Sequence, residues 1–199
     1  DSLGSDVNGN YSVAIGDATL AAQNFTTATE SLNVAVGYQA GTSVTTGILN
    51  TIVGGFAGDA LQDADRNVAA GYAALTSDTL GNRSTALGYG TLQTQNFTTA
   101  TDSYNVAVGY DAGASVTTGR ENTIVGGRAG DSLQTGNGNT AVGQNASFDS
   151  VSRSTATVLG SDLSSHAQDN TFRVKGDNGV YNTANSSTWN TTSDERIKK

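Results

Sequence analysis

The stretch QNFTTATESLNVAVGY at residues 23–38 returns, with two changes, as QNFTTATDSYNVAVGY at residues 95–110. The hexapeptide NTIVGG at residues 50–55 recurs at 122–127, which is the same offset along the chain. Repetition at a fixed period is the signature of a stacked architecture, and it constrains the fold more strongly than local propensity does. We therefore place two super-repeats at residues 10–81 and 82–153.

Each super-repeat contains four smaller units, and a glycine that closes an apolar triplet marks each unit. Most of these glycines follow one another at the spacing of Gly37 and Gly54, whereas one unit of each super-repeat is longer. A unit this short cannot bury an apolar face alone, whereas stacked units can. Residues 1–165 are therefore predicted to form an all-β fold, a parallel β-roll or β-solenoid of about nine rungs, closed by Gly16, Gly37, Gly54, Gly71, Gly88, Gly109, Gly126, Gly143 and Gly160.

The triplet before each closing glycine has apolar residues on both faces of the predicted strand. Val34 and Val36 flank Ala35, and most other units also carry Ala in the middle. Parallel strands with two apolar faces need a cover on each face. We expect one face to line the interior of the rung. We expect the Ala-rich face, which has no partner within one chain, to pack against two further copies in a parallel homotrimer.

Two further columns indicate turns. An Asn or Ser opens every strand but the ninth, as at Ser12 and Asn33, and is predicted to bond local backbone at a turn. A second glycine column lies seven residues before the closing glycine, and we expect it to supply positive φ angles at corners. Its members are Gly9, Gly47, Gly81, Gly119 and Gly136.

The two longer units carry four extra residues within the segment QNFTTAT. These insertions are predicted to bulge outward as paired loops, and added residues at such positions disturb no core. Surface loops on a rigid scaffold commonly carry recognition. We therefore predict a contact surface for a host cell-surface receptor, a glycan being one candidate, at Asn24, Phe25, Thr26, Asn96, Phe97 and Thr98.

The segments NYSVAIGDAT, NVAVGY, NTIVGG and NTAVGQ resemble the head repeats of trimeric autotransporter adhesins. Repeats of the Ala-Val-Gly-Tyr type also occur in phage tail-fibre proteins. The resemblance covers about residues 8–165 and implies a trimeric parallel β-roll. Both kinds of rung in this chain are longer than the usual adhesin unit, so the turn shape and the cross-section of the roll are expected to differ.

The chain ends in TTSDERIKK, residues 191–199, where five of the last six residues are charged. The segment SDERIKK resembles the opening of the self-cleaving intramolecular chaperone domain of phage tail fibres and tailspikes, whose pattern is Ser-Asp-x-Arg-x-Lys. The resemblance implies cleavage between Ser193 and Asp194, with residues 193–199 beginning the chaperone. A Ser hydroxyl needs a base, and Lys198 could serve if burial lowers its pKa. Asp194 and Arg196 would position the segment. A solvated tail is the alternative.

Residues 166–192 lie between the roll and this motif. Phe172 and Val174 precede the turn-like KGDNG, and Val180 and Tyr181 follow it, which predicts a short hairpin. Together with Trp189, these residues could form a trimeric neck, and a loosely ordered linker is the alternative.

Tyr38, Tyr72, Tyr89 and Tyr110 occupy one column, immediately after a closing glycine. Such a column could stack on sugars, because tyrosine combines an apolar ring with a polar tip. The interpretation that we favour from the sequence is that it covers the flank of the roll and steadies the rungs.

The composition argues against several classes of function. A net charge of −8 disfavours nucleic acid and anionic membrane surfaces as partners, and no apolar run reaches the ~20 residues of a membrane span. With no Cys and the single histidine His166, no metal site or cofactor is expected. A glycan depolymerase generally needs two placed carboxyl groups, yet the only glutamates are Glu30, Glu121 and Glu195.

The sequence thus predicts a non-enzymatic structural and receptor-recognition segment of a virion tail fibre, matured by self-cleavage of its C-terminal chaperone. The repeats alone would equally fit the head of a bacterial trimeric surface adhesin, located on the bacterial cell surface. A depolymerase is the least favoured of the three hypotheses.

Overall fold

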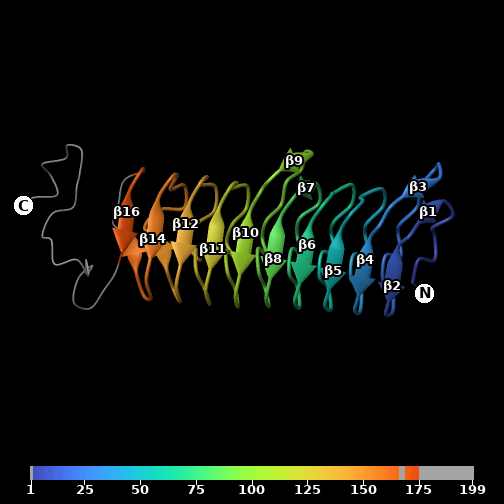
Figure 1. Cartoon of the computed structure of the whole chain (residues 1–199), viewed down its shortest axis with the longest axis horizontal. Coiled ribbons are helices and arrows are strands. Elements are labelled where there is room, and N and C mark those ends of the chain that lie inside the picture. The colour runs from blue at the N-terminus through green and yellow to red at the C-terminus, as the bar shows by residue number, and fades with distance from the viewer. Residues whose placement is uncertain (1, 166–168, 175–199) are drawn as a thin grey trace, which may run out of the picture.

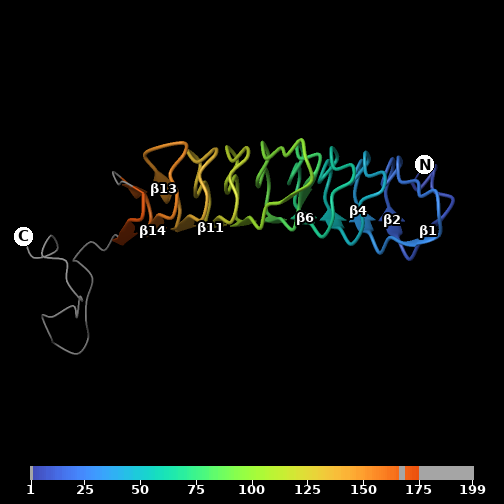
Figure 2. The ribbon, with the colours of Figure 1, turned by 90° about the horizontal axis from the view of Figure 1, so that it is seen from above.

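The computed structural model describes residues 2–165 and 169–174, which form a parallel β-solenoid without a helix. The rungs stack along one axis, and their strands lie in a single row (Figure 1). Seen from above, the strands of this row form one long side of the solenoid (Figure 2). The other long side consists of loops and the short strand β13 (Ser147–Phe148), which pairs with β15 (Ser164–Ser165). The predicted all-β solenoid of about nine rungs is confirmed.

One triplet from each rung joins a ten-stranded parallel sheet, in which every strand pairs with the next one along the solenoid. The register keeps each column aligned, so Ala35 lies opposite Ile52 and Ile52 lies opposite Ala69. The strands are β2 (Val13–Ile15), β4 (Val34–Val36), β5 (Thr51–Val53), β6 (Val68–Ala70), β8 (Thr85–Leu87), β10 (Val106–Val108), β11 (Thr123–Val125), β12 (Thr140–Val142), β14 (Thr157–Leu159) and β16 (Phe172–Val174).

The last of these strands, β16, falls in the segment for which the sequence predicts one arm of a hairpin. In the structure it pairs in parallel with β14 and continues the solenoid. The same backbone ladder that joins the other rungs thus also accommodates this triplet. The remaining residues of the predicted hairpin and neck lie outside the described residues, namely Val180, Tyr181 and Trp189.

The Ala-rich face of the sheet lines the interior of the solenoid, so the prediction that this face contacts other copies is wrong. The middle residues of the strands, such as Ala35 and Ala107, are fully buried within the single chain. The flanking residues point outward, and Val53 and Leu87 are 40% and 36% exposed. The interior is narrow, because the opposite wall of each rung contributes its own apolar side chains.

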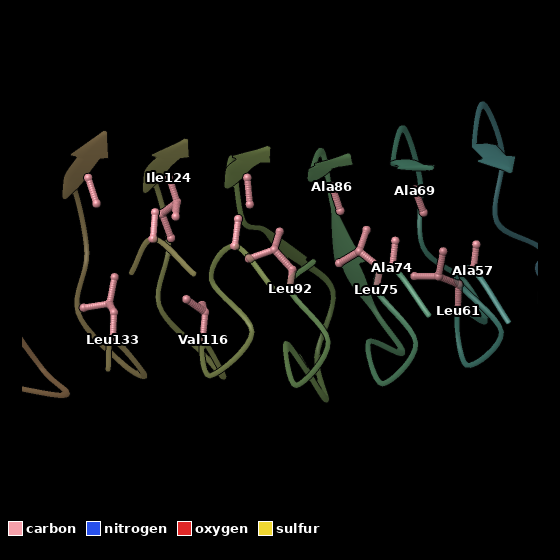
Figure 3. Packing of buried hydrophobic residues seen from close by; sticks show 14 of the residues in the cluster. Ala57, Leu61, Ala69, Ala74, Leu75, Ala86, Leu92, Val116, Ile124 and Leu133 are labelled. Carbon is pink, nitrogen blue, oxygen red and sulfur yellow. The ribbon is translucent and has the colours of Figure 1, made fainter. Parts of the chain in front are cut away.

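Large and small side chains alternate between the two walls of this interior. Figure 3 shows Leu75 and Leu92 below the strand that carries Ala86. Where the strand carries Ile124, the opposite wall has Gly130, and a Cβ added there would lie 3.0 Å from Cδ1 of Ile124. Interiors packed at crystal-like density need this complementarity of volume.

The Asn column forms a hydrogen-bonded ladder between rungs, and the predicted bonds to local backbone are not observed there. Asn67 is buried; its Oδ1 accepts from the backbone N–H of Ser84 at 2.8 Å and its Nδ2 donates to the carbonyl of Gly81 at 2.8 Å. Both partners belong to the next rung. Buried backbone groups need partners, and this side chain supplies them at a corner. Equivalent bonds are made by Asn33, Asn50, Asn105, Asn122 and Asn139.

The two columns require glycine for different physical reasons. The closing glycines have φ angles between 131° and 140°, a region that side chains disfavour. The second column was predicted to need positive φ as well, and this is wrong, since none of its members has one. At Gly47 the missing side chain allows close approach of rungs, because a Cβ there would overlap the carbonyl oxygen of Ala64 and lie 3.0 Å from its nitrogen. At Gly9 and Gly81 it leaves room for the carboxylates of Asp6 and Asp78 in the same rung.

Candidate functional site

The two insertions form paired loops that project from the row of rungs, as the sequence predicts (Figure 1). In the first, β3 (Thr29–Glu30) pairs in parallel with β1 (Gly9–Asn10), and in the second, β9 (Thr101–Asp102) pairs with β7 (Gly81–Asn82). Each insertion therefore returns to the preceding rung and is held there by backbone hydrogen bonds.

The six predicted contact residues divide into two groups. Asn24, Thr26, Asn96 and Thr98 are exposed at the surface of the loops. Phe25 and Phe97 are only 5% and 6% exposed, so their rings fill the loops from within. A ligand that contacts the loops would therefore meet amide and hydroxyl groups, and the two rings would support that surface from below.

A buried polar cluster anchors the second loop. Gln95 Nε2 donates to Asp78 Oδ2 at 2.6 Å and to Ser84 Oγ at 2.8 Å, and Gln95 Oε1 accepts from Asn105 Nδ2 at 2.8 Å. Asp78 Oδ1 accepts from the backbone N–H of Phe97 at 3.0 Å. Burial raises the pKa of Asp78, although these hydrogen bonds oppose the shift. Ser84 stands in the Asn column, and this cluster connects it to Asn105, the next Asn of the ladder.

The first loop has the same arrangement. Gln23 Nε2 donates to Asp6 Oδ2 at 2.5 Å and to Ser12 Oγ at 3.1 Å, while Gln23 Oε1 accepts from Asn33 Nδ2 at 2.8 Å. Both clusters were missed at the level of sequence. The sequence does carry a signal for them. In the rungs of Ser12 and Ser84, Ser replaces Asn in the Asn column, and in these rungs and the ones that follow them the column that elsewhere holds Val or Leu, such as Val44, holds Asp or Gln instead.

The outward face of the ten-stranded sheet carries a long apolar surface. Its two outward columns hold Val, Ile, Leu, Thr, Phe and one Ala, and we call this surface the outer sheet face. Large apolar side chains that are at least 36% exposed on it are Val13, Ile15, Val53, Leu87, Val106, Val142, Phe172 and Val174.

Five aromatic rings form a continuous row beside this face, and we call the row the aromatic ladder. Phe56 packs edge-on against Tyr38 and Tyr72, with ring centroids 5.3 and 5.7 Å apart. Tyr72 stacks on Tyr89 at 5.4 Å, and Tyr89 stacks on Tyr110 at 5.3 Å. The four tyrosines are 50–57% exposed. The sequence predicts the tyrosine column but misses Phe56, which stands one position later in its rung.

Other candidate sites are either absent from the described residues or lie beyond them. Within residues 2–165 and 169–174, no group of three or more metal-ligating acidic or histidine side chains is close enough to hold an ion. No helix in this part of the chain is long and apolar enough to cross a membrane. The residues predicted for self-cleavage lie outside it, namely Ser193, Asp194, Arg196 and Lys198.

Comparison with known proteins identifies no relative: no family model, no curated protein and no solved structure matches this chain.

Proposed function

We propose that the chain is a structural and receptor-recognition segment of a phage tail fibre, located in the virion and assembled as a parallel homotrimer. A solenoid whose rungs share one register extends along one axis (Figure 1), and an extended shaft is what a fibre requires. The resemblance of its repeats to those of tail fibres and trimeric adhesins supports this function.

The observation that carries the proposal is the outer sheet face. Parallel sheets are almost always covered on both faces, and a contiguous exposed apolar surface on a soluble protein usually marks an interface. Here one face is covered by the chain's own loops, and the other is open along the whole sheet. Identical copies side by side would cover it along its full length, and the number three follows from the resemblance.

The assembly is tested by placing a charge on the outer sheet face. Wild-type protein is expected to have three times the monomer mass of 20.2 kDa by light scattering. Leu87→Glu should dissociate the trimer, because an unpaired carboxylate would be buried between copies. Val151→Glu is the matched control, since Val151 is 45% exposed but lies outside the sheet. A stable wild-type monomer, or equal masses for both variants, would refute the assembly through this face.

Recognition by the loops is tested by removing their exposed amides and hydroxyls. The quadruple variant Asn24→Ala, Thr26→Ala, Asn96→Ala, Thr98→Ala should lose about tenfold or more in binding of labelled protein to the bacterial strain that binds wild type best. The control is Gln62→Ala with Gln134→Ala, two exposed residues in the column of Asn24 and Asn96 on rungs without an insertion. Equal losses in both variants would contradict a specific role of the loops.

Maturation completes the proposal. Three repetitive chains can pair out of register by a whole rung, and such non-local pairing is slow and prone to aggregation. A C-terminal chaperone that trimerises first would set the register, and cleavage at Ser193, with Lys198 as proton acceptor, would then leave a kinetically stable product. The residues between β16, which still belongs to the solenoid, and Ser193 would form the neck between shaft and chaperone.

A further inference from the structure

We infer that the aromatic ladder is a binding site for an extended, neutral glycan strand that lies along the solenoid axis with about one sugar ring for each rung. This inference rests on the proposed receptor function and names a ligand class and a site for it. The site is separate from the insertion loops.

The ladder is not a requirement of the rung. Gly127 stands in the same column as the ladder tyrosines, and a Cβ added there would meet nothing within 4 Å. Nevertheless β11, which precedes it, pairs with β10 and β12 in the common register. Other rungs carry Asp17, Gln144 and Ser161 at this position. A rung therefore keeps its register without a ring at this position.

The ladder also departs from the super-repeat. Gly55 and Gly127 are equivalent residues, and each leaves a gap in the column. In the first super-repeat Phe56 fills the gap from the next position, whereas the equivalent residue in the second is Arg128. Continuity of rings is thus maintained over five consecutive rungs by residues from two columns. Duplication of the super-repeat alone would place the same residue type at positions 56 and 128, whereas the chain has Phe56 and Arg128.

The geometry of the row fits a linear carbohydrate. Steps of 5.3–5.7 Å between ring centroids are close to the length of one pyranose unit in an extended β-linked chain. Because Tyr72, Tyr89 and Tyr110 stack on one another, a strand along the axis would meet their ring edges and phenol hydroxyls, and about half of each side chain is exposed. Mutual stacking holds the rings in place before binding, which reduces the entropy lost on association.

The surrounding charges favour a neutral ligand. At one end of the ladder, Asp111 raises the pKa of the Tyr110 phenol and Arg128 opposes that shift. Both signs of charge are therefore present, and the chain as a whole has a net charge of −8, which disfavours polyanions. A neighbouring copy in a parallel assembly would contact the whole length of the solenoid, whereas the ladder occupies only the second to the sixth rung.

The test is affinity electrophoresis of the native protein in gels that contain hydroxyethylcellulose, arabinoxylan or glucomannan, three neutral β-linked polysaccharides. Wild type should be retarded by at least one of them. Tyr72→Ala with Tyr89→Ala should raise the dissociation constant about tenfold or more. The corresponding Phe variant should retain binding, as should the control Tyr11→Ala with Tyr104→Ala, which removes two exposed rings outside the ladder. Gly127→Tyr extends the ladder by one ring and should tighten binding.

Absence of retardation in all three gels, or equal retardation of the Ala variant and wild type, would overturn the inference. A change in oligomeric mass of the Ala variant without any glycan binding would show that a second copy covers the ladder, and would also overturn it. The trimer test with Leu87→Glu is independent of these outcomes. A trimer that binds no glycan therefore refutes the ladder alone, and a monomer refutes the assembly.

Discussion

Gly71→Ala is expected to lower the free energy of unfolding of the solenoid by about 4 kcal/mol or more. Gly71 has a φ of 140°, a conformation that costs a residue with a side chain about 1–3 kcal/mol. An added Cβ would also overlap the carbonyl oxygen of Gly88 and lie 2.5 Å from its carbonyl carbon. Because both atoms are backbone of the next rung, no rotation of a side chain can relieve the overlap.

The overlap can therefore be relieved only if the backbones of the two rungs move apart. Gly71 and Gly88 donate backbone hydrogen bonds of 2.8 Å to Val53 and Ala70, and these bonds join successive rungs at the same corner. Moving the backbone of one rung away from the next would weaken them together. The effect should spread to neighbouring rungs, since solenoid stability depends on nearest-neighbour interfaces.

Gly127→Ala is the matched control for this measurement. Gly127 lies one position after a closing glycine, its φ is outside the left-handed region, and an added Cβ meets no atom within 4 Å. The substitution should change the free energy of unfolding by less than about 1 kcal/mol, with stabilisation the favoured sign, because it reduces the entropy of the unfolded chain. Urea unfolding followed by circular dichroism measures both variants. Similar midpoints for the two would contradict the role given to the closing glycines.

The rungs could be predicted from the sequence because their period is carried by glycines, and glycine at these corners is dictated by backbone geometry. The sequence could not predict which face of each strand points into the solenoid and which points outward. Ala35 and its flanking valines are all apolar, so the pattern of polarity does not distinguish the inside from the outside. Size decides it: the interior has room for Ala opposite Leu, and Leu75 occupies that room from the other wall.

In the candidate sites, too, some features could be predicted from the sequence and others depend on how the chain folds. The insertion loops follow from a difference in spacing, which the sequence shows directly. The burial of Phe25 and Phe97 beneath them depends on how the loop folds back, and residue type does not reveal it. The partners of the Asn column lie in the next rung, and such separations along the chain are invisible to an argument from local turns. Phe56 was missed because it joins the aromatic ladder from a different column.

Asn67→Ala is expected to cost about 3 kcal/mol of unfolding free energy, because it removes both hydrogen bonds that this buried side chain makes to backbone groups of the next rung. The N–H of Ser84 and the carbonyl of Gly81 would lose partners at 2.8 Å in a region closed to water. Each unsatisfied buried group costs about 1–3 kcal/mol.

The control is Asn137→Ala, which removes a bond of the same kind at the surface. Asn137 Oδ1 accepts from the backbone N–H of Arg120 at 2.8 Å, but the residue is exposed, so water can replace the amide. Its loss should cost less than about 1 kcal/mol, and the difference between the two variants in urea unfolding isolates the contribution of burial. If Asn67→Ala proved as mild as Asn137→Ala, the Asn ladder would not be what holds this corner of the solenoid together. A large difference would show that each rung depends on its neighbour for the hydrogen bonding of its own backbone.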